Sequence, residues 1–466
     1  MKKNVTFIKI MAIGLLSLTA CKKNDDSSQI ATPVEPVANP ISDTGCLSGS
    51  IKGTMLAGKT YNVCGDIIIN EGDTLFVQEG VTINMTGNYG IGVKGSLVCL
   101  GTKAKPNYFT MKSVTKTDVL GADPTTDPAY AGKWIGIIGA TTCKLMVLKW
   151  THVEFGGGAI AATSPIKAIY TSPYPLFFQN PNGVFVLEDS WVYGSVDDAI
   201  RTYGGKLSIM RNTFEKIGYT GGEALNAKAG TIGDFAYNLC IGVATNGPKL
   251  SNAGVIVGVP ASNMNFYNNT IINSGFRRAA AGRGGSINFE ESAGGKAYNN
   301  LIVNCKFGLR VVGNPIADTA NLRYGYNFYY ADSLSVASNF IPSTSVSTAI
   351  SAPQETDIPK PSTYLPTGWK IGDVYTAPTS LLGANNPKFV NGPTPMPASL
   401  NLRDISFVGS YNFKLQPSSP CINAAYKGFA ARADVPVHPK YGATEITAPG
   451  SDIGAFQSNG TGNQQY

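Results

Sequence analysis

The phrase "FYNNTIINSG", residues 266–275, returns in altered form as "AYNNLIVNCKF", residues 297–307. Asn269 and Asn300 occupy matching places in the two copies. Short phrases of apolar and polar residues that recur after a few dozen residues indicate stacked structural repeats. The pair therefore predicts a coil built from similar turns.

Further copies of this phrase occur on both sides of it. The matching positions are Thr151 in "KWTHVEFGG", Asp189 in "LEDSWVYG", Asn212 in "IMRNTFEKIG", Asn238 in "AYNLCIGVA" and Asn327 in "YGYNFYY". From Asp189 onward, successive positions are separated by 23, 26, 31, 31 and 27 residues. Unequal steps exclude a strict short-period repeat, but they are typical of a coil whose strands are constant and whose turns vary.

A parallel β-solenoid explains why asparagine recurs. One turn of such a coil cannot bury its apolar side chains alone, and stacking on neighbouring turns closes the core. At a sharp bend between strands the backbone often becomes left-handed, which asparagine tolerates better than most residues. Stacked amides can then bond to one another along the coil. We therefore interpret the repeated asparagines as an Asn ladder, a part of the scaffold.

The composition agrees with this interpretation. The chain has 466 residues, of which 53 are glycine and only 14% are charged. Few segments keep helical spacing for three turns, whereas "GDTLFVQEGVTINMTGNYGIGVKGSLVCLGT", residues 72–102, alternates apolar and polar residues between glycines. The sequence predicts an all-β fold.

The chain resembles the right-handed parallel β-helix proteins of pectate-lyase-like architecture. The resemblance is carried by the asparagine phrases, by "VKGSLVCLGTKAKPNYFT" (93–110), "GKWIGIIG" (132–139), "NNPKFVNG" (385–392), "NFKLQPSSPCINAA" (412–425) and "SDIGAFQ" (451–457). It implies a single-stranded right-handed parallel β-helix with long lateral loops. It implies little about activity, because this scaffold hosts lyases, hydrolases, adhesins and binding proteins.

The N-terminus indicates export. Three lysines precede an apolar run that ends at residue 20, which is too short to span a bilayer and is typical of a signal peptide over residues 1–20. "LTAC", ending at Cys21, resembles a bacterial lipobox, which implies acylation of Cys21 and attachment to a membrane. An ordinary secreted protein with a chance cysteine there is the alternative.

Residues 21–44 are polar and contain proline, so they predict a flexible tether. The charged residues after Cys21 resemble the export signal of Bacteroidetes surface lipoproteins. This resemblance implies an outer-membrane lipoprotein exposed at the cell surface.

The predicted β-helix covers residues 45–330. The next stretch, 331–400, is rich in Ser, Thr and Pro and departs from the repeat, so we expect a loop-rich excursion there, with a separate small domain as the alternative. Residues 401–466 are expected to form the closing turns of the coil.

Charge and cysteines limit the possible partners. The 37 basic residues include three lysines of the signal peptide, so the remaining 34 exceed the 30 acidic residues by only four. This balance indicates no nucleic-acid partner, and we expect a monomer. Cys46 and Cys64 are candidates for a disulfide in an oxidising compartment, and the other five cysteines lie in strand-like apolar phrases, which predicts burial.

One outward column of side chains is the main candidate for a functional surface. Matching apolar positions, expected to point inward, are Ile200, Leu225, Val255, Ile287 and Leu309. Side chains alternate along a strand, so the following residue of each pair should point outward. The predicted outward column is Arg201, Asn226, Ile256, Asn288 and Arg310, with rungs about 4.8 Å apart.

Other polar residues extend this face. Two positions further along lie Tyr203, Lys228 and Glu290, edge positions are Asp197, Asp198, Glu223 and Glu291, and the segment "GFRRAAAGRGG" adds Arg277, Arg278 and Arg283. Arginines in a row suit uronate or sulfate groups, because their forked guanidinium binds two oxygens at once. Candidate substrate contacts are Tyr203, Asn226, Asn288, Arg277 and Arg278.

Three functions for this face stay open. It is a solvated surface, a polysaccharide-binding surface or a catalytic one, and a protein-binding adhesin is the competing class. An eliminating lyase would use Lys228 or Lys296 as base, with Arg201 or Arg310 neutralising the substrate carboxylate. Glu290 and Glu291, with Asn288, are candidate oxygen ligands for Ca²⁺.

Two further patterns were weighed for catalysis. "NFEESAGGK" resembles the calcium segment of alginate and chondroitin lyases, but the spacing from Lys296 to Arg310 departs from that pattern, so no role is carried over. Asp197, Asp198 and Glu223 are candidate glycosidase carboxyls. Adjacent residues of a strand point to opposite sides, which disfavours the pair, so a lyase is expected before a glycoside hydrolase. His152 and His438 are interpreted as structural.

Overall fold

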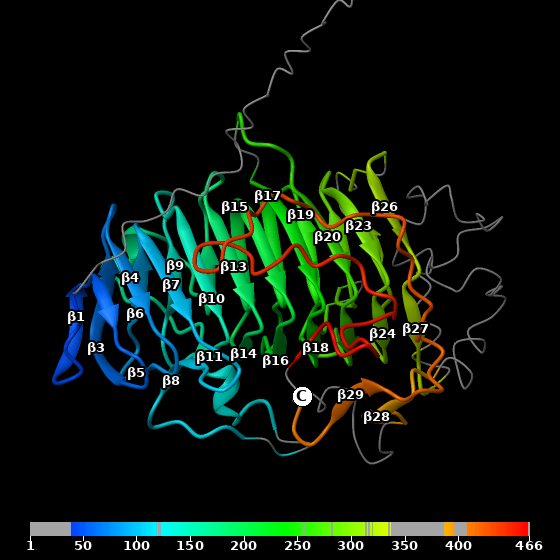
Figure 1. Ribbon diagram of the computed structural model, residues 1–466, viewed down its shortest axis with the longest axis horizontal. Helices are drawn as coiled ribbons and strands as arrows, with labels where there is room; N and C mark the ends of the chain where they lie inside the picture. The colour runs from blue at the N-terminus through cyan, green and yellow to red at the C-terminus, as the bar shows by residue number, and fades with distance from the viewer. Residues whose placement is uncertain are drawn as a thin grey trace, which may run out of the picture.

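The computed structural model describes residues 39–117, 119, 123–254, 257–280, 283–312, 315, 317–318, 320–333, 336, 386–395 and 408–464. It confirms the predicted all-β solenoid: 27 strands form one parallel sheet that is wound into a single-stranded parallel β-helix (Figure 1). The predicted signal peptide, Cys21 and residues 21–38 of the predicted tether lie outside the described residues. Within the described ranges, no helix is long and apolar enough to cross a membrane.

Each turn of the coil contributes a strand to each of three faces, numbered here in chain order. Face 1 is formed by β2 (Gly53–Met55), β4 (Thr74–Val77), β7 (Ser96–Leu100), β10 (Leu145–Lys149), β13 (Val184–Glu188), the second parts of β15 (Ile200–Met210) and β17 (Leu225–Ala236), β20 (Asn263–Tyr267), β23 (Gly294–Tyr298) and β26 (Leu322–Gly325).

Face 2 follows face 1 in each turn, after the bend that holds the repeated asparagines. It is formed by the first part of β3 (Thr60–Ile69), β5 (Thr82–Met85), β8 (Asn107–Met111), β11 (Thr151–Gly156), β14 (Trp191–Ser195), β16 (Thr213–Ile217), β18 (Leu239–Ile241), β21 (Thr270–Ile272), β24 (Leu301–Val303) and β27 (Phe328–Tyr330).

Face 3 completes each turn. It is formed by the second part of β3, β6 (Gly90–Val93), β9 (Gly136–Gly139), β12 (Leu176–Phe178), the first parts of β15 and β17, β19 (Pro248–Ser251), β22 (Asn288–Glu290) and β25 (Arg310–Val312). Strand β1 (Cys46–Ser50) pairs with β3 at the N-terminal end, where Cys46 and Cys64 are joined in a disulfide.

The Asn ladder is present at the bend between faces 1 and 2. Asn212 Nδ2 donates to Asn238 Oδ1 at 3.0 Å, and the same bond links Asn238 to Asn269 at 3.1 Å. It continues from Asn269 to Asn300 and from Asn300 to Asn327, both at 2.8 Å. Each Oδ1 also accepts the backbone N–H of the preceding ladder residue. The amides thereby satisfy the backbone at a bend that no strand pairing covers.

Two details of the predicted ladder are wrong. Ser190, not Asp189, occupies the ladder position in its turn, since its N–H donates to Asn212 Oδ1 and its Oγ accepts from Thr151. The left-handed residue is the one before the ladder position: φ is 50° at Asp189 and 59° at Arg211. In "YNN" the first asparagine accepts the strained conformation and the second forms the ladder.

The core runs the length of the coil. Phe214, Phe235, Phe266 and Phe289 contact one another in sequence along it, with neighbouring ring centroids 5.1 to 6.1 Å apart; the Phe235–Phe266 contact is edge-to-face. Among the described residues, the five cysteines outside the disulfide are buried, as predicted. Two glycines at the corner between faces 3 and 1, Gly204 and Gly205, have φ of 89° and 112° and let β15 continue through the bend.

The C-terminal residues do not add turns to the coil. Strands β28 (Phe389–Asn391) and β29 (Asn412–Leu415) form a separate antiparallel pair, and residues 426–464, called the strap, lie along the outside of the coil (Figure 1). The strap reaches Lys149 at His438 and returns to Asn299 at Gly454. Closing turns were expected over 401–466; the described part of that range, residues 408–464, forms a lateral cover instead.

The predicted tether and the predicted excursion are each described only in part. Residues 39–41 of the predicted tether are attached to the first turn, where Ile41 N–H donates to Thr54 O at 2.9 Å. Of the predicted excursion over 331–400, only 331–333, 336 and 386–395 are among the described residues. The 3-10 helices η1 (Pro128–Tyr130) and η2 (Pro165–Ala168) belong to lateral loops.

Candidate functional site

The outward column of face 3 exists, with one correction. Strand pairing places Arg201, Asn226, Lys249, Asn288 and Arg310 side by side on successive turns, and these five residues are called the polar row. Lys249 replaces the predicted Ile256, which lies outside the described residues. The strand of this turn is Pro248–Ser251, and Pro248, seven residues before Val255, is the residue that pairs with Leu225. The error arose because the apolar phrase around Val255 has the pattern of a strand.

A second column borders the polar row. Tyr203 pairs with Lys228, and Ser251 pairs with Glu290; the residues of β17 and β19 are themselves in register. Ser251, which lies between Lys228 and Glu290, was missed by the sequence analysis. Lys228 Nζ donates to its hydroxyl at 3.4 Å.

Face 3 changes character along the coil. In the N-terminal turns its outward residues are apolar, among them Ile68, Ile138 and Phe177, and the lateral loop that contains η2 covers them. From Arg201 onward they are polar. Faces 1 and 2, by contrast, carry the contacts of the C-terminal residues: Val435 and Tyr441 pack on face 1, and Phe413 and Phe456 pack on face 2. Face 3 thus carries a continuous polar row, although most of its side chains are buried: Asn226, Lys249, Asn288 and Arg310 are at most 6% exposed.

Two ion pairs organise the polar row. Arg201 donates from Nε to Asp198 Oδ2 at 2.6 Å and lies 4.9 Å over the ring of Tyr174. Lys249 Nζ lies 2.5 Å from Glu290 Oε1. All four side chains are at most 15% exposed, so both pairs are poorly screened. Two of the three cations of the row, Arg201 and Lys249, are therefore already bound by the chain's own carboxylates.

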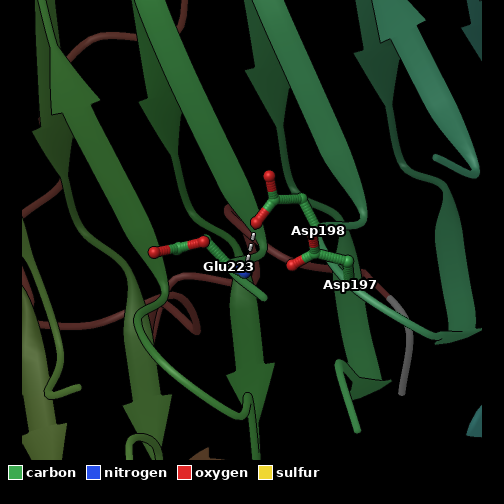
Figure 2. A group of neighbouring side chains, drawn as sticks. All are labelled: Asp197, Asp198 and Glu223. Atoms are coloured by element: carbon green, nitrogen blue, oxygen red, sulfur yellow. Dashed lines mark hydrogen bonds between the residues drawn. The ribbon is translucent and has the colours of Figure 1, made fainter. Parts of the chain in front are cut away.

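Three carboxyls converge at one edge of the row. Asp197, Asp198 and Glu223 each place an oxygen within 4.8 Å of the others, and the backbone N–H of Glu223 donates to Asp198 at 2.8 Å (Figure 2). The expectation that the two aspartates point to opposite sides was wrong, because both precede β15 and lie in a bend. Strand alternation does not apply there.

The environment separates the pKa values of these three groups. Burial, and then the charge of Asp198, raise the pKa of Glu223 well above its usual value, in spite of two amide donors. Burial, and then the charge of Asp198, raise the pKa of Asp197 to about 6, against the lowering charges of Arg201 and Arg278. Burial opposes ionisation of Asp198, but hydrogen bonds from Glu223 and the charge of Arg201 lower its pKa. A neutral and an ionised carboxyl side by side can serve as acid and base.

Lys228 and Tyr203 keep the predicted place on this face. Burial, followed by the charges of Lys249 and Arg201, lowers the pKa of Lys228, which brings the amine closer to the range of a general base. The Tyr203 ring lies 6.1 Å from that of Tyr170 in a group of aromatic side chains. Lys228 is therefore the predicted catalytic residue whose environment best suits proton transfer.

Other predicted site residues serve the scaffold. Arg277 donates to the carbonyl oxygens of Ile217 and Gly218 at 2.8 Å and lies over the Tyr130 ring, so it fastens a loop. Lys296 was considered as a base, but it belongs to β23 on face 1, with Nζ 5.9 Å from the centroid of Phe429 in the strap. Neither reaches the polar row.

The basic residues at the far end of the row remain close to it. Arg310 donates to Gly284 O at 3.3 Å and lies over Phe307, and burial followed by the charge of Arg283 lowers its pKa. Arg278 lies at the edge, where its charge acts on Asp197. These arginines, with Lys306, form a basic end to the face.

The predicted calcium ligands do not fit a calcium ion. Glu290 is engaged by the ammonium of Lys249 and by the amide of Asn288 at 2.9 Å. Glu291 follows the end of β22 with φ of 54° and accepts a hydrogen bond from Ser251. An ammonium group against the carboxylate occupies the position and the charge that a calcium ion would need.

Comparison with protein-family profiles, with curated protein sequences and with solved structures finds no match to this chain. The functional assignment therefore depends on the chemistry of face 3.

Proposed function

We propose that the protein binds an extended extracellular polysaccharide along the polar row of face 3. The observation that carries this proposal is the register of Arg201, Asn226, Lys249, Asn288 and Arg310 on successive strands. A row that repeats at each strand spacing matches a ligand that itself repeats. Tyr203, beside the row, supplies an aromatic edge for a sugar ring.

A retention assay tests this proposal. The purified full chain is run through native gels that contain single polysaccharides, and Tyr203→Ala is compared with Tyr108→Ala, a half-buried tyrosine of face 2. Retention by at least one polysaccharide, weakened by Tyr203→Ala only, is the expected result. Retention by none, or equal weakening by both variants, contradicts the proposal and favours the adhesin alternative.

Catalysis on the bound chain is the second candidate. Hydrolysis is favoured by the convergence of Asp197, Asp198 and Glu223, and elimination by the lowered pKa of Lys228. The two reactions leave different products, since elimination yields an unsaturated uronate and hydrolysis yields only a new reducing end. Glu223→Gln should abolish hydrolysis, and Lys228→Met should abolish elimination.

The location of the protein is proposed from its N-terminus. Cys21, in the lipobox-like phrase, would carry the lipid that attaches a monomer to the outer membrane, with the coil displayed outward. Cys21→Ser should move the protein from the membrane fraction to the soluble fraction. Continued sedimentation with membranes would contradict the anchor.

A further inference from the structure

Three amide oxygens on face 3 have no hydrogen-bond partner among the described residues. They belong to Asn226, Asn246 and Asn288, each of which is only 3% exposed. A buried carbonyl oxygen without a donor costs about 1–3 kcal/mol. These oxygens have almost no exposed area, so a ligand would reach them only after the side chains over them move; donors brought there would recover that free energy.

Carboxyl groups fix the direction of all three amides. Asn226 and Asn246 donate from Nδ2 to the two oxygens of Glu223, at 3.2 and 3.3 Å. Asn288 donates to Glu290 Oε2 at 2.9 Å. Turning an amide over would aim its oxygen at a carboxyl oxygen, and the one proton of a neutral Glu223 can satisfy only one such contact. The chain therefore presents acceptors, not donors, to a ligand.

The charges of the central row disfavour an anionic ligand. Arg201 is bound to Asp198 and Lys249 to Glu290. A uronate carboxylate over Asn226 or Asn288 would meet an amide oxygen and lie close to Glu223 or Glu290. To bind either neighbouring cation of the row, Arg201 or Lys249, it would have to break a buried ion pair and leave one carboxylate unpaired.

We infer that face 3 recognises a neutral polysaccharide, whose hydroxyl groups donate to Asn226, Asn246 and Asn288. This inference rests on the proposed function and names its substrate class. Asn226 and Asn288 lie two strands apart, about 10 Å, which is comparable to the length of a disaccharide unit. One donor from alternate sugars of an extended chain would reach each of them.

The inference also selects between the two reactions. A neutral sugar lacks the carboxylate that acidifies the proton removed in elimination, so Lys228 would have no such proton to take. Binding alone, or hydrolysis at the carboxyl cluster, remains compatible with a neutral chain. An acidic chain would instead use the basic end of the face, where Arg283 is exposed and acts on Arg310.

The test compares neutral and acidic polysaccharides on the full chain. The neutral panel is a β-glucan, a galactomannan and a xylan, and the acidic panel is polygalacturonate, alginate and chondroitin sulfate. We expect retention by a neutral polymer that is equal at low and high salt and unchanged by a calcium chelator. Asn226→Ala and Asn288→Ala should each weaken it by about tenfold, the effect of one lost hydrogen bond of about 1.4 kcal/mol. The exposed, off-face Asn182→Ala should leave it unchanged.

Several results would overturn the inference. Retention by acidic polymers alone, lost at high salt and weakened by Arg283→Gln, would show that the basic end selects the ligand while polysaccharide binding stands. Dependence on calcium would assign the amide oxygens to a cation. Retention by no polymer would refute the proposed function itself. Melting temperatures of the variants show whether a loss of retention reflects unfolding, and the wild-type panel decides the substrate class without any variant.

Discussion

Asn269 lies in the middle of the Asn ladder, and its replacement by alanine tests how the ladder holds the coil. The side chain is fully buried. Its Nδ2 donates to Phe235 O at 3.0 Å and to Asn300 Oδ1 at 2.8 Å. Its Oδ1 accepts from Asn238 N–H at 3.0 Å and from Asn238 Nδ2 at 3.1 Å. Asn269→Ala removes all four bonds.

The expected loss of stability depends on which polar groups keep a hydrogen-bond partner after the substitution. Asn238 Nδ2 still donates to Ile209 O, and Asn300 Oδ1 still accepts the backbone N–H of residue 269. The backbone N–H of Asn238 loses its acceptor inside the protein, which costs about 1–3 kcal/mol, and the remaining bonds contribute about 1 kcal/mol each. We expect Asn269→Ala to lower the free energy of unfolding by about 4–6 kcal/mol.

Hydrogen exchange can locate this loss. Because each turn of a solenoid contacts its neighbours only, the destabilisation should be largest in the turns around the substitution. Exchange of the Asn238 amide should accelerate the most, and amides near the disulfide at Cys46 should change little. Urea denaturation followed by circular dichroism measures the total change.

Asn182→Ala is the matched control, since Asn182 is an exposed asparagine. It should change the free energy of unfolding by less than about 0.5 kcal/mol. A loss below about 1 kcal/mol for Asn269→Ala, or faster exchange spread evenly over all turns, would refute the view that the ladder satisfies a buried bend.

The remaining predictions concern the strap and the close approach of turns. Arg211 binds both oxygens of Asp189 at 2.8 and 3.0 Å and Thr447 of the strap at 2.8 Å. Arg211→Ala should therefore lower the free energy of unfolding by about 3–5 kcal/mol and hasten proteolysis of the strap, whereas Thr447→Val should lower it by about 1 kcal/mol. Equal effects of the two substitutions would contradict a buried ion pair at Arg211. Burial raises the pKa of Asp234 from 3.8 to about 7 where it accepts from Arg432 N–H beside Asp434. The native state thus holds this proton more tightly than the unfolded chain, so the contribution to stability is full below pH 3.8 and is lost as the pH rises to about 7. Asp234→Asn should therefore become more stable relative to the wild type as the pH rises through this window, by a few kcal/mol in the free energy of unfolding above pH 7. Melting temperatures of the two proteins measured across the window test this. A constant difference between them would refute the assignment. A Cβ at Gly233, where φ is 132°, would lie 2.0 Å from Leu207 O, so Gly233→Ala should fail to give folded protein. As a control, Gly258→Ala, where φ is 84° and nothing lies within 4 Å of the added Cβ, should lower the free energy of unfolding by about 1–2 kcal/mol. A stable Gly233→Ala protein would contradict the register of face 1.

The candidate site was only partly predictable. Arg201, Asn226, Asn288 and Arg310 were placed correctly because apolar and polar residues alternate within each strand. Lys249 and Ser251 were missed because the apolar phrase around Val255 has the pattern of a strand, whereas the strand of this turn is β19, which ends at Ser251. Local pattern cannot tell a strand from a loop of the same composition when neither neighbour is known.

The sequence by itself determined the class of fold and its scaffold. Alternation and the asparagine bends are properties of adjacent residues, and they are visible without coordinates. Only the tertiary structure decided which side chains meet across turns: the three carboxyls at Asp197, Asp198 and Glu223, the engaged state of Lys249 and Glu290, and the strap on face 1. These contacts join residues up to about three hundred positions apart. Their register depends on the lengths of loops that follow no repeat, so no local rule fixes it.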